Sequence, residues 1–247
     1  MGDYRVRLGG IDFHAAYPGP APLWHILQSI SGWEEKAQDG TDTSQHWSGQ
    51  GSTAGAAQTE SRQITIESVM RGTSQFGAGS TLAGMDALNR LGRTTLVVSE
   101  DGRALVREAD VRVTQVQSTR VSALVRRVTI SLTADDPLRY SAESRTLFNG
   151  VNLLPNRGGR VAFPRLALTG PHGAITITHP GGVWTFPALA SGSRLIDFRE
   201  HIVWNGNARV FGVGSGPEAR VLGDGSSWTV AGLGAGTAIL TRAEAWS

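Results

Sequence analysis

The sequence predicts a mainly β protein with a single helix, divided into two β-rich domains. Apolar and polar residues alternate in several runs, and one run places Val128, Ile130 and Leu132 on the same face of a strand. Turn-forming residues separate these runs, and glycine alone contributes 32 of the 247 residues. Only residues 81–91 have a clear helical spacing. Polar side chains on the second face of each run indicate antiparallel sheets with one solvated side.

Strands in the first half are predicted at residues 64–67, 111–116 and 121–133, where β-branched residues gather. In the run at 111–116, the residues concerned are Val111, Val113 and Val116. Residues 23–30 follow Pro22 and fit either a short helix or a strand. Periodicity does not decide between these two interpretations.

Two dipeptides predict β-hairpins. Asp101-Gly102 lies between two apolar runs in the first half, and Asn205-Gly206 does the same in the second half. Both dipeptides tolerate the positive φ angles of a type I′ turn. From about residue 160 onward, short strands alternate with turns at a spacing typical of a β-sandwich or barrel.

The predicted helix at residues 81–91 has one apolar stripe, formed by Leu82, Met85, Leu88 and Leu91. Asp86 and Arg90 are spaced for an ion pair on another face. We expect Ser80 or Thr81 to cap the start of the helix and Gly92 to adopt the left-handed conformation after its end. Such a stripe is more typical of packing against a core than of cofactor binding.

Residues 38–61 form a long segment rich in Gly, Ser, Thr and Gln, with Trp47 as its one large apolar residue. A loop of this length is usually either functional or disordered. Two interpretations remain equally open: an unstructured excursion, or a loop that becomes ordered against a neighbouring subunit.

A domain boundary is predicted between residues 134 and 160. The strand at 121–133 runs into Ala134-Asp135-Asp136-Pro137, which is a strong turn signal. Further turn residues follow, namely Asn149-Gly150, Pro155 and Gly158-Gly159. We therefore expect one domain at residues 1–145 and a second at 146–247.

Composition excludes several classes of function. The chain has no cysteine, which excludes disulfides, thiolate metal sites and cysteine nucleophiles. It has no apolar run of about 18 residues, so we expect no transmembrane helix, and no apolar signal segment is visible at the start. Lys36 is the only lysine among 23 basic residues, and the formal charge is only +2. The arginines are scattered, which argues against a nucleic-acid-binding face, and we expect most of them on the solvated surface or at partner contacts.

No catalytic, cofactor-binding or metal-binding residues are predicted, and we expect that the protein is not an enzyme. Six histidines are present, and none has the spacing of a metal motif: His14, His25, His46, His172, His179 and His201. Asp135-Asp136 is a poor glycosidase pair because adjacent strand residues point to opposite faces, so we interpret it as a turn. Asp197 interrupts an apolar strand, and we expect it to reach a buried arginine or to cap a turn. The glycine runs at 212–216 and 232–236 are expected to be turns rather than phosphate loops.

Tryptophan offers the main alternative. Trp184, Trp204, Trp228 and the near-terminal Trp246 lie in the second half. They could stack on sugars, as in carbohydrate-binding modules, or lie in the core or at an interface, which we favour. A carbohydrate-binding or host-adhesion module is therefore the second hypothesis.

The order of motifs along nearly the whole chain resembles the distal tail protein (Dit) family, the minor tail proteins of phages with long non-contractile tails. The most telling motif closes the first domain and spans residues 129–140, from Thr129 to Tyr140. The other motifs, in order, are residues 4–10, Ser29-Ile30-Ser31-Gly32-Trp33, residues 62–66, the helix, Asn156-Arg157-Gly158-Gly159, Phe163-Pro164-Arg165-Leu166, Thr169-Gly170, Leu195-Ile196-Asp197, the Asn205-Gly206 hairpin and a final strand ending in Trp246.

The resemblance implies a structural protein of the virion at the phage tail tip, assembled in the host cytoplasm. It implies a belt-type first domain that forms a homo-hexameric ring, and a galectin-like β-sandwich as the second domain. The ring would join the tail tube protein to the baseplate hub or tail-associated protein. DNA would pass through its lumen without specific binding, and no membrane insertion is expected.

The predicted strand facing has a direct test. Replacing Ile130 by Asp places an unpaired charge on the apolar face, which should cost several kcal/mol and prevent folding. Circular dichroism and a thermal melt of Ile130→Asp check this. A soluble, cooperatively melting variant would show that the strand faces the other way.

Overall fold

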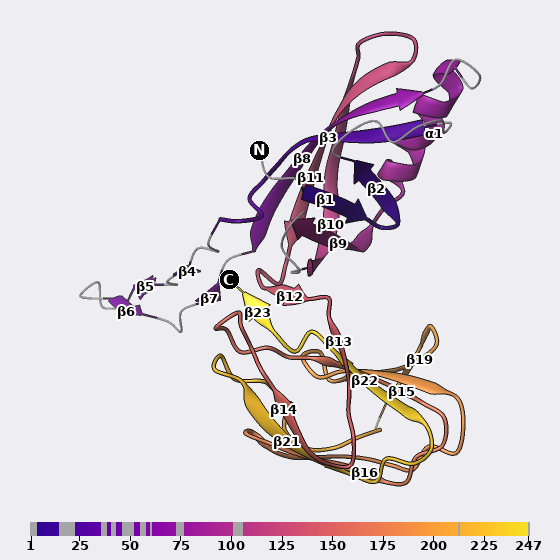
Figure 1. The fold of residues 1–247 in the computed structure, drawn as a ribbon. Helices are drawn as coiled ribbons and strands as arrows, with labels where there is room; N and C mark the ends of the chain where they lie inside the picture. The colour runs from indigo at the N-terminus through magenta and orange to yellow at the C-terminus, as the bar shows by residue number, and fades with distance from the viewer. Residues whose placement is uncertain are drawn as a thin grey trace. The chain divides into compact units, whose positions relative to one another are not determined.

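The computed structural model describes residues 4–14, 23–35, 39–40, 43–45, 52–54, 58–59, 61–72, 77–100, 106–211 and 213–246. The chain divides into two compact units, Met1–Leu138 (unit 1) and Arg139–Ser247 (unit 2). Figure 1 shows that the described chain is mainly β with one helix, as the sequence predicts. Arg139–Ser141, at the start of unit 2, pairs with the last strand of that unit.

Unit 1 contains a closed, barrel-like sheet. Its strands are β1 (Tyr4–Leu8), β2 (Ile11–His14), β3 (Leu23–Ser31), β8 (Arg62–Gly72), β9 (Arg93–Glu100), β10 (Val106–Arg120) and β11 (Val125–Ala134). They follow one another in the order β11-β8-β3-β2-β1-β9-β10, and pairing of β10 with β11 closes the circle. The predicted hairpin between β9 and β10 is confirmed, since Ser99 pairs with Val106, although the Asp101-Gly102 turn lies outside the described residues.

One pair in this circle is parallel. β2 and β3 run in the same direction, whereas every other neighbouring pair of the circle is antiparallel. Strands that alternate in direction cannot close on an odd number, so a sheet of these seven strands needs one parallel junction. A parallel pair requires a crossover connection, and here it falls within residues 15–22, outside the described residues.

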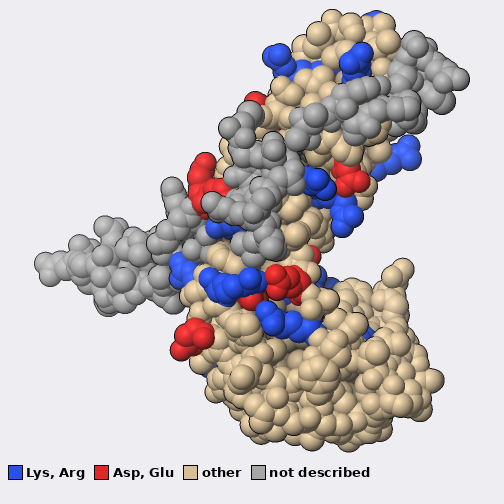
Figure 2. Space-filling view, in the orientation of Figure 1, with Lys and Arg blue, Asp and Glu red and all other residues tan. Residues whose placement is uncertain are grey.

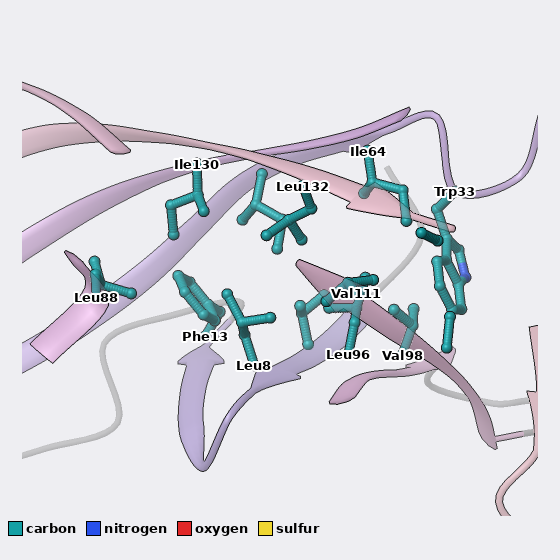
Figure 3. Packing of buried hydrophobic residues seen from close by; sticks show 14 of the residues in the cluster. Leu8, Phe13, Trp33, Ile64, Leu88, Leu96, Val98, Val111, Ile130 and Leu132 are labelled. Carbon is teal, nitrogen blue, oxygen red and sulfur yellow. The ribbon is translucent and has the colours of Figure 1, made fainter. Parts of the chain in front are cut away.

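The interior of the sheet is filled by apolar side chains (Figure 3). Val128, Ile130 and Leu132 are fully buried, which confirms the predicted facing of β11. Ile64 and Ile66 on β8 are buried beside them, since Ile130 pairs with Ile66 and Leu132 with Ile64. Further core side chains, labelled in Figure 3, are Leu8, Phe13, Trp33, Leu88, Leu96, Val98 and Val111.

Two β-bulges shift the alternation within single strands. In β3 the register changes between Leu27 and Ser29, so both Leu27 and Ile30 pack against the core. In β10 the register changes between Val113 and Gln115, so both Val113 and Val116 pack against the core. The extra residue in β3 explains why the sequence of residues 23–30 fits a helix as well as a strand. At the bulge, the spacing between core-facing residues is three instead of the two expected for a strand.

The helix α1 (Gly77–Asn89) confirms the existence of the predicted helix but corrects its ends. It begins before Ser80 and Thr81, so neither residue is its cap. It ends before Gly92, which does not adopt a positive φ, because the last turn closes with Leu91 N–H donating to Leu88 O at 3.2 Å. Leu88 is buried, Met85 and Leu91 pack against the core, and Asp86 and Arg90 are exposed. The side chain of Leu82 lies outside the described residues.

The long segment at residues 38–61 contains two short antiparallel pairs. β4 (Asp39–Gly40) pairs with β7 (Gln58–Thr59), and β5 (Thr43–Gln45) pairs with β6 (Ser52–Ala54). Trp47 lies outside the described residues. Both interpretations of this segment stay open as predictions.

Residues 32–35, here called the plug loop, cover one end of the closed sheet. The indole of Trp33 is 1% exposed and belongs to the core. The Arg62 guanidinium donates to the carbonyls of Gly32 and Trp33, each at 3.1 Å, to Glu35 O, and to Pro137 O at 3.0 Å. One buried side chain therefore fixes both the plug loop and the end of unit 1.

Arg107 holds the plug loop from a second strand. Its guanidinium donates to both carboxylate oxygens of Glu34 and lies over the Trp33 ring, 6.0 Å from the centroid. Together with Arg139 and Arg242, Arg62 and Arg107 are buried, and these four are exceptions to the surface or partner-contact positions expected for most of the arginines. Buried arginines need carbonyl or carboxylate partners, and for Arg62 and Arg107 these come from distant parts of the chain.

Unit 2 contains two antiparallel sheets. The six-stranded sheet has the order β13 (Ser144–Thr146), β22 (Thr237–Thr241), β15 (Arg165–Thr169), β18 (Ser193–Asp197), β19 (Ile202–Asn205) and β20 (Ala208–Val210). The four-stranded sheet has the order β14 (Gly150–Leu154), β21 (Ser226–Ala231), β16 (Ile175–His179) and β17 (Gly182–Phe186).

The two sheets pack face to face through aromatic side chains. Phe198, which directly follows β18, contacts Trp184 of β17 at 5.0 Å and Trp228 of β21 at 6.0 Å between ring centroids. Leu166, Leu168 and Leu240 of the six-stranded sheet are fully buried on the same interior. The predicted sandwich of the second half is therefore built around a mixed aromatic and aliphatic core.

The second predicted hairpin is confirmed with a corrected turn. Asn205 pairs with Ala208, so Asn205 ends β19 and the turn consists of Gly206 and Asn207. Gly206 has a φ of 58°, which satisfies the left-handed position of a tight turn. At the other end of unit 2, β12 (Arg139–Ser141) pairs with β23 (Ala245–Trp246).

The plug loop generates a stability prediction at Gly32. This residue has a φ of 75°, and a Cβ there would lie 1.9 Å from the carbonyl oxygen of Gln63. Gly32→Ala should therefore displace the plug loop and destabilise unit 1 by more than about 3 kcal/mol. Urea denaturation followed by circular dichroism measures the change.

Gly10→Ala is the matched control. Gly10 also has a positive φ, 87°, but nothing lies within 4 Å of a Cβ built there. Gly10→Ala should lower the free energy of unfolding by only about 1–2 kcal/mol, which is the cost of a left-handed backbone conformation at a residue with a Cβ. Equal losses in both variants would show that the contact with Gln63 contributes nothing.

Candidate functional site

The histidines do not form a common site. His14 and His25 lie in unit 1, His172, His179 and His201 lie apart in unit 2, and His46 lies outside the described residues. His172 Nε2 lies 3.3 Å from Thr237 O, and its Nδ1 accepts from Gly234 N–H at 3.2 Å, so this imidazole joins two turns. His201 is exposed and pairs with Glu218 at 2.7 Å. Each of these two histidines has a local structural role.

His25 is a titratable group whose surroundings change its pKa strongly. Its side chain is buried on β3, where its ring contacts Phe13 at 5.2 Å. Burial, and secondly the nearby His14, lower the pKa of His25 to about 4. His25 is therefore neutral at pH 7 and belongs to the core of unit 1.

Asp135 and Asp136 have separate structural roles. The Asp135 carboxylate pairs with Arg93 at 2.8 Å and with Arg112 at 3.7 Å. Asp136 Oδ1 accepts from the backbone N–H of Leu138 at 3.1 Å, which is the geometry of a local turn. The interpretation as a turn at the edge of a domain is confirmed.

Asp197 caps a turn, as its sequence context predicts, and its arginine partner is half-buried rather than buried. Its Oδ2 accepts from Arg165 Nε at 2.7 Å, and its Oδ1 accepts from the backbone N–H groups of Arg199 and Glu200 at 3.0 and 3.2 Å. The side chain thus joins β18 to β15 and caps the following turn.

The two glycine runs are turns in which backbones approach each other closely. A Cβ on Gly232 would lie 1.9 Å from Ala174 O, and one on Gly216 would lie 2.2 Å from Val183 O. Neither run begins a helix within the described part of unit 2. Phosphate binding at a helix N-terminus, the usual role of such runs, therefore has no structural basis here.

A cluster of charged residues, which we call the Glu244 cluster, escaped the sequence analysis. Glu244 is 1% exposed, and its carboxylate binds Arg157 Nε at 3.0 Å and Arg145 at 3.3 Å. Arg157 also pairs with Glu143 at 3.0 Å, and the two carboxylates raise the pKa of Arg157. These residues are separated by up to about 100 positions in the sequence, so no local pattern indicates them.

The tryptophans of unit 2 divide into two groups. Trp184 and Trp228 are buried in the core, as we favoured for this set. Trp204 and Trp246 are only half-buried. Of these, Trp204 lines a cavity of about 430 Å³ on the outward side of the six-stranded sheet, together with Arg165, Leu195, Asp197, Glu200 and Asn207.

Among the described residues, no group of three or more His, Asp or Glu side chains is arranged to hold a metal ion. In the same part of the chain, no helix is long and apolar enough to span a membrane.

His25 generates a pH prediction. Below about pH 6.5 the unfolded chain protonates this residue, whereas the folded chain does so only below about 4, so acidification favours unfolding. This group alone should lower the free energy of unfolding by up to about 1.4 kcal/mol per pH unit between these values. Urea denaturation at pH 7, 6 and 5 should show a shallower pH dependence for His25→Phe than for the original chain. Equal slopes would contradict the burial of a neutral imidazole.

Comparison with protein-family models finds no match. Comparison with curated proteins also finds no match. Solved structures do match over the whole chain.

One match is the crystal structure of the phage SPP1 Dit protein (gp 19.1), described as a paradigm of the hub adsorption apparatus in Gram-positive-infecting phages. It aligns with a TM-score of 0.54 and 12% identity over 99% of both chains. The phage p2 baseplate in its activated conformation aligns in two structures. The strontium-bound form gives a TM-score of 0.56 at 12% identity over 98% of both chains. The calcium-bound form gives 0.58 at 11% identity over 97% of this chain and 98% of the other. The resemblance drawn from the order of motifs is thus confirmed in the fold: the chain is similar to Dit and baseplate proteins from end to end.

Proposed function

We propose that this protein forms a homo-hexameric ring that joins the tail tube to the baseplate hub, or tail-associated protein, at the tail tip of a phage with a long non-contractile tail. Unit 1 would be the belt-type domain that builds the ring, and unit 2 would be a galectin-like domain. The observation that carries the proposal is the match of both units, in one chain, to the SPP1 Dit protein and to p2 baseplate chains. Assembly in the host cytoplasm is consistent with the absence of cysteine.

The packing of unit 1 supports a ring of several copies. Core side chains fill the interior of the closed sheet (Figure 3), so DNA cannot pass through a single copy. In the proposed ring, the passage for DNA would therefore lie between copies, and a repeated heterologous contact would close the ring.

Charge supports the same proposal. The formal charge is +2, and Figure 2 shows basic and acidic side chains interspersed on the face that it draws. A conduit for DNA should not retain it electrostatically, and a strongly basic lining would do so.

The tip of the β10–β11 hairpin is a candidate for the contact between copies. Arg120 and Arg126 face each other across the two strands, and Arg127 follows. Arg120 donates to Ser122 O and Arg126 to Ser118 Oγ, and none of the three pairs with a described carboxylate. Like charges opposite each other are unfavourable, and an acidic surface on a neighbouring copy would relieve this repulsion.

Light scattering and negative-stain images of the purified protein test the ring. We expect the mass of six 26.2 kDa chains and ring-shaped particles. A monomer at tens of micromolar, both alone and with the tail tube protein present, would contradict the proposal.

The double variant Arg120→Glu, Arg127→Glu tests the hairpin. It should raise the protein concentration needed for hexamer formation at least tenfold. The control variant Arg90→Glu with Arg220→Glu, which changes two other exposed arginines, should leave that concentration unchanged. A hexamer unaffected by the hairpin variant would place the contact elsewhere on unit 1.

A further inference from the structure

The cavity beside Trp204 has no part in the packing described above. Its volume of about 430 Å³ lies in the range of about 300–1,000 Å³ typical of sites for small molecules. Residues from β15, β18, β19 and the two turns that flank β19 line it, so three adjacent strands of the six-stranded sheet build it.

One side of the cavity is apolar. Leu195 and Trp204 are direct cross-strand neighbours on β18 and β19, and Leu195 is 39% exposed. The guanidinium of Arg209 lies over the Trp204 ring, 5.1 Å from the centroid. Arg209 is the cross-strand neighbour of Trp204 on β20 and does not line the cavity, whereas Trp204 does.

The other side is polar and partly fixed. The Arg165–Asp197 ion pair, at 2.7 Å, is held by two backbone N–H groups that donate to Asp197. Glu200 and Asn207 are exposed and form no hydrogen bond through their side chains to other described residues. The cavity therefore offers a carboxylate and a carboxamide to an incoming ligand.

We propose that this cavity binds a neutral saccharide. A sugar ring has a C–H face that packs on an aromatic side chain and hydroxyl groups that both donate and accept hydrogen bonds. Here Trp204 and Leu195 match the apolar face, Glu200 accepts from hydroxyls, and Arg165 and Asn207 donate to them. Asp197 and Glu200 outnumber Arg165 by one charge, which disfavours phosphate and acidic sugars. The inference concerns unit 2 alone and does not depend on the ring.

A glycan array probed with the full-length protein, followed by saturation-transfer NMR with the best neutral sugar, tests the proposal. We expect binding of neutral glycans, and Trp204→Ala should weaken it at least about tenfold. Glu200→Gln and Asn207→Ala change exposed side chains without disturbing packing, and each should weaken binding by about three- to tenfold.

Phe211→Ala is the matched control. Phe211 is 82% exposed and follows β20, but it does not line the cavity, so its loss should leave sugar binding unchanged. Three results would each overturn the proposal: retention of acidic glycans only, absence of any binding at millimolar sugar, or binding by Trp204→Ala and Glu200→Gln as tight as that of the original chain. Light scattering of the same variants reports assembly separately, so failure of sugar binding is distinguishable from failure of the ring.

Discussion

Closure of the sheet in unit 1 is the constraint on which its other features depend. Pairing of β10 with β11 removes the free sheet edges that would otherwise invite aggregation. It also requires a parallel junction among the seven strands, which is β2–β3, and it encloses an interior that needs a seal at each end. The plug loop provides one seal beside Arg62, where β8 begins. α1 lies at the opposite end of β8, where Gly84 approaches Met70.

Several motifs that carry the resemblance to the Dit family have special backbone requirements. Gly32 admits the close approach to Gln63, and Asp136 fixes the turn that ends unit 1. Asn156 accepts from the N–H groups of Gly158 and Ala245, and this ties its Gly-Gly turn to the last strand. Each of these positions depends on a particular side chain, or on the lack of one.

The sequence predicted strands, the helix and the facing of β11 because these depend on local periodicity. It left residues 23–30 undecided because a bulge at one residue erased that periodicity. The burial of Arg62 and Glu244 could not be predicted because their partners lie far away in sequence: Arg62 binds Pro137, and Glu244 binds Arg145. The cavity beside Trp204 could not be predicted for the same reason, because only the pairing of β15 with β18 brings Arg165 to it.

The pairing of β12 with β23 sets the order in which the two units can form during translation. The closed sheet of unit 1 is complete once the ribosome has made Ala134, but unit 2 needs Glu244 and Ala245 to neutralise Arg157 and pair with Tyr140. At about 5–20 residues per second, unit 1 has roughly 5–20 seconds to fold alone. During that interval the incomplete sandwich of unit 2 exposes its aromatic core, so unit 2 is more prone to aggregate during translation than unit 1.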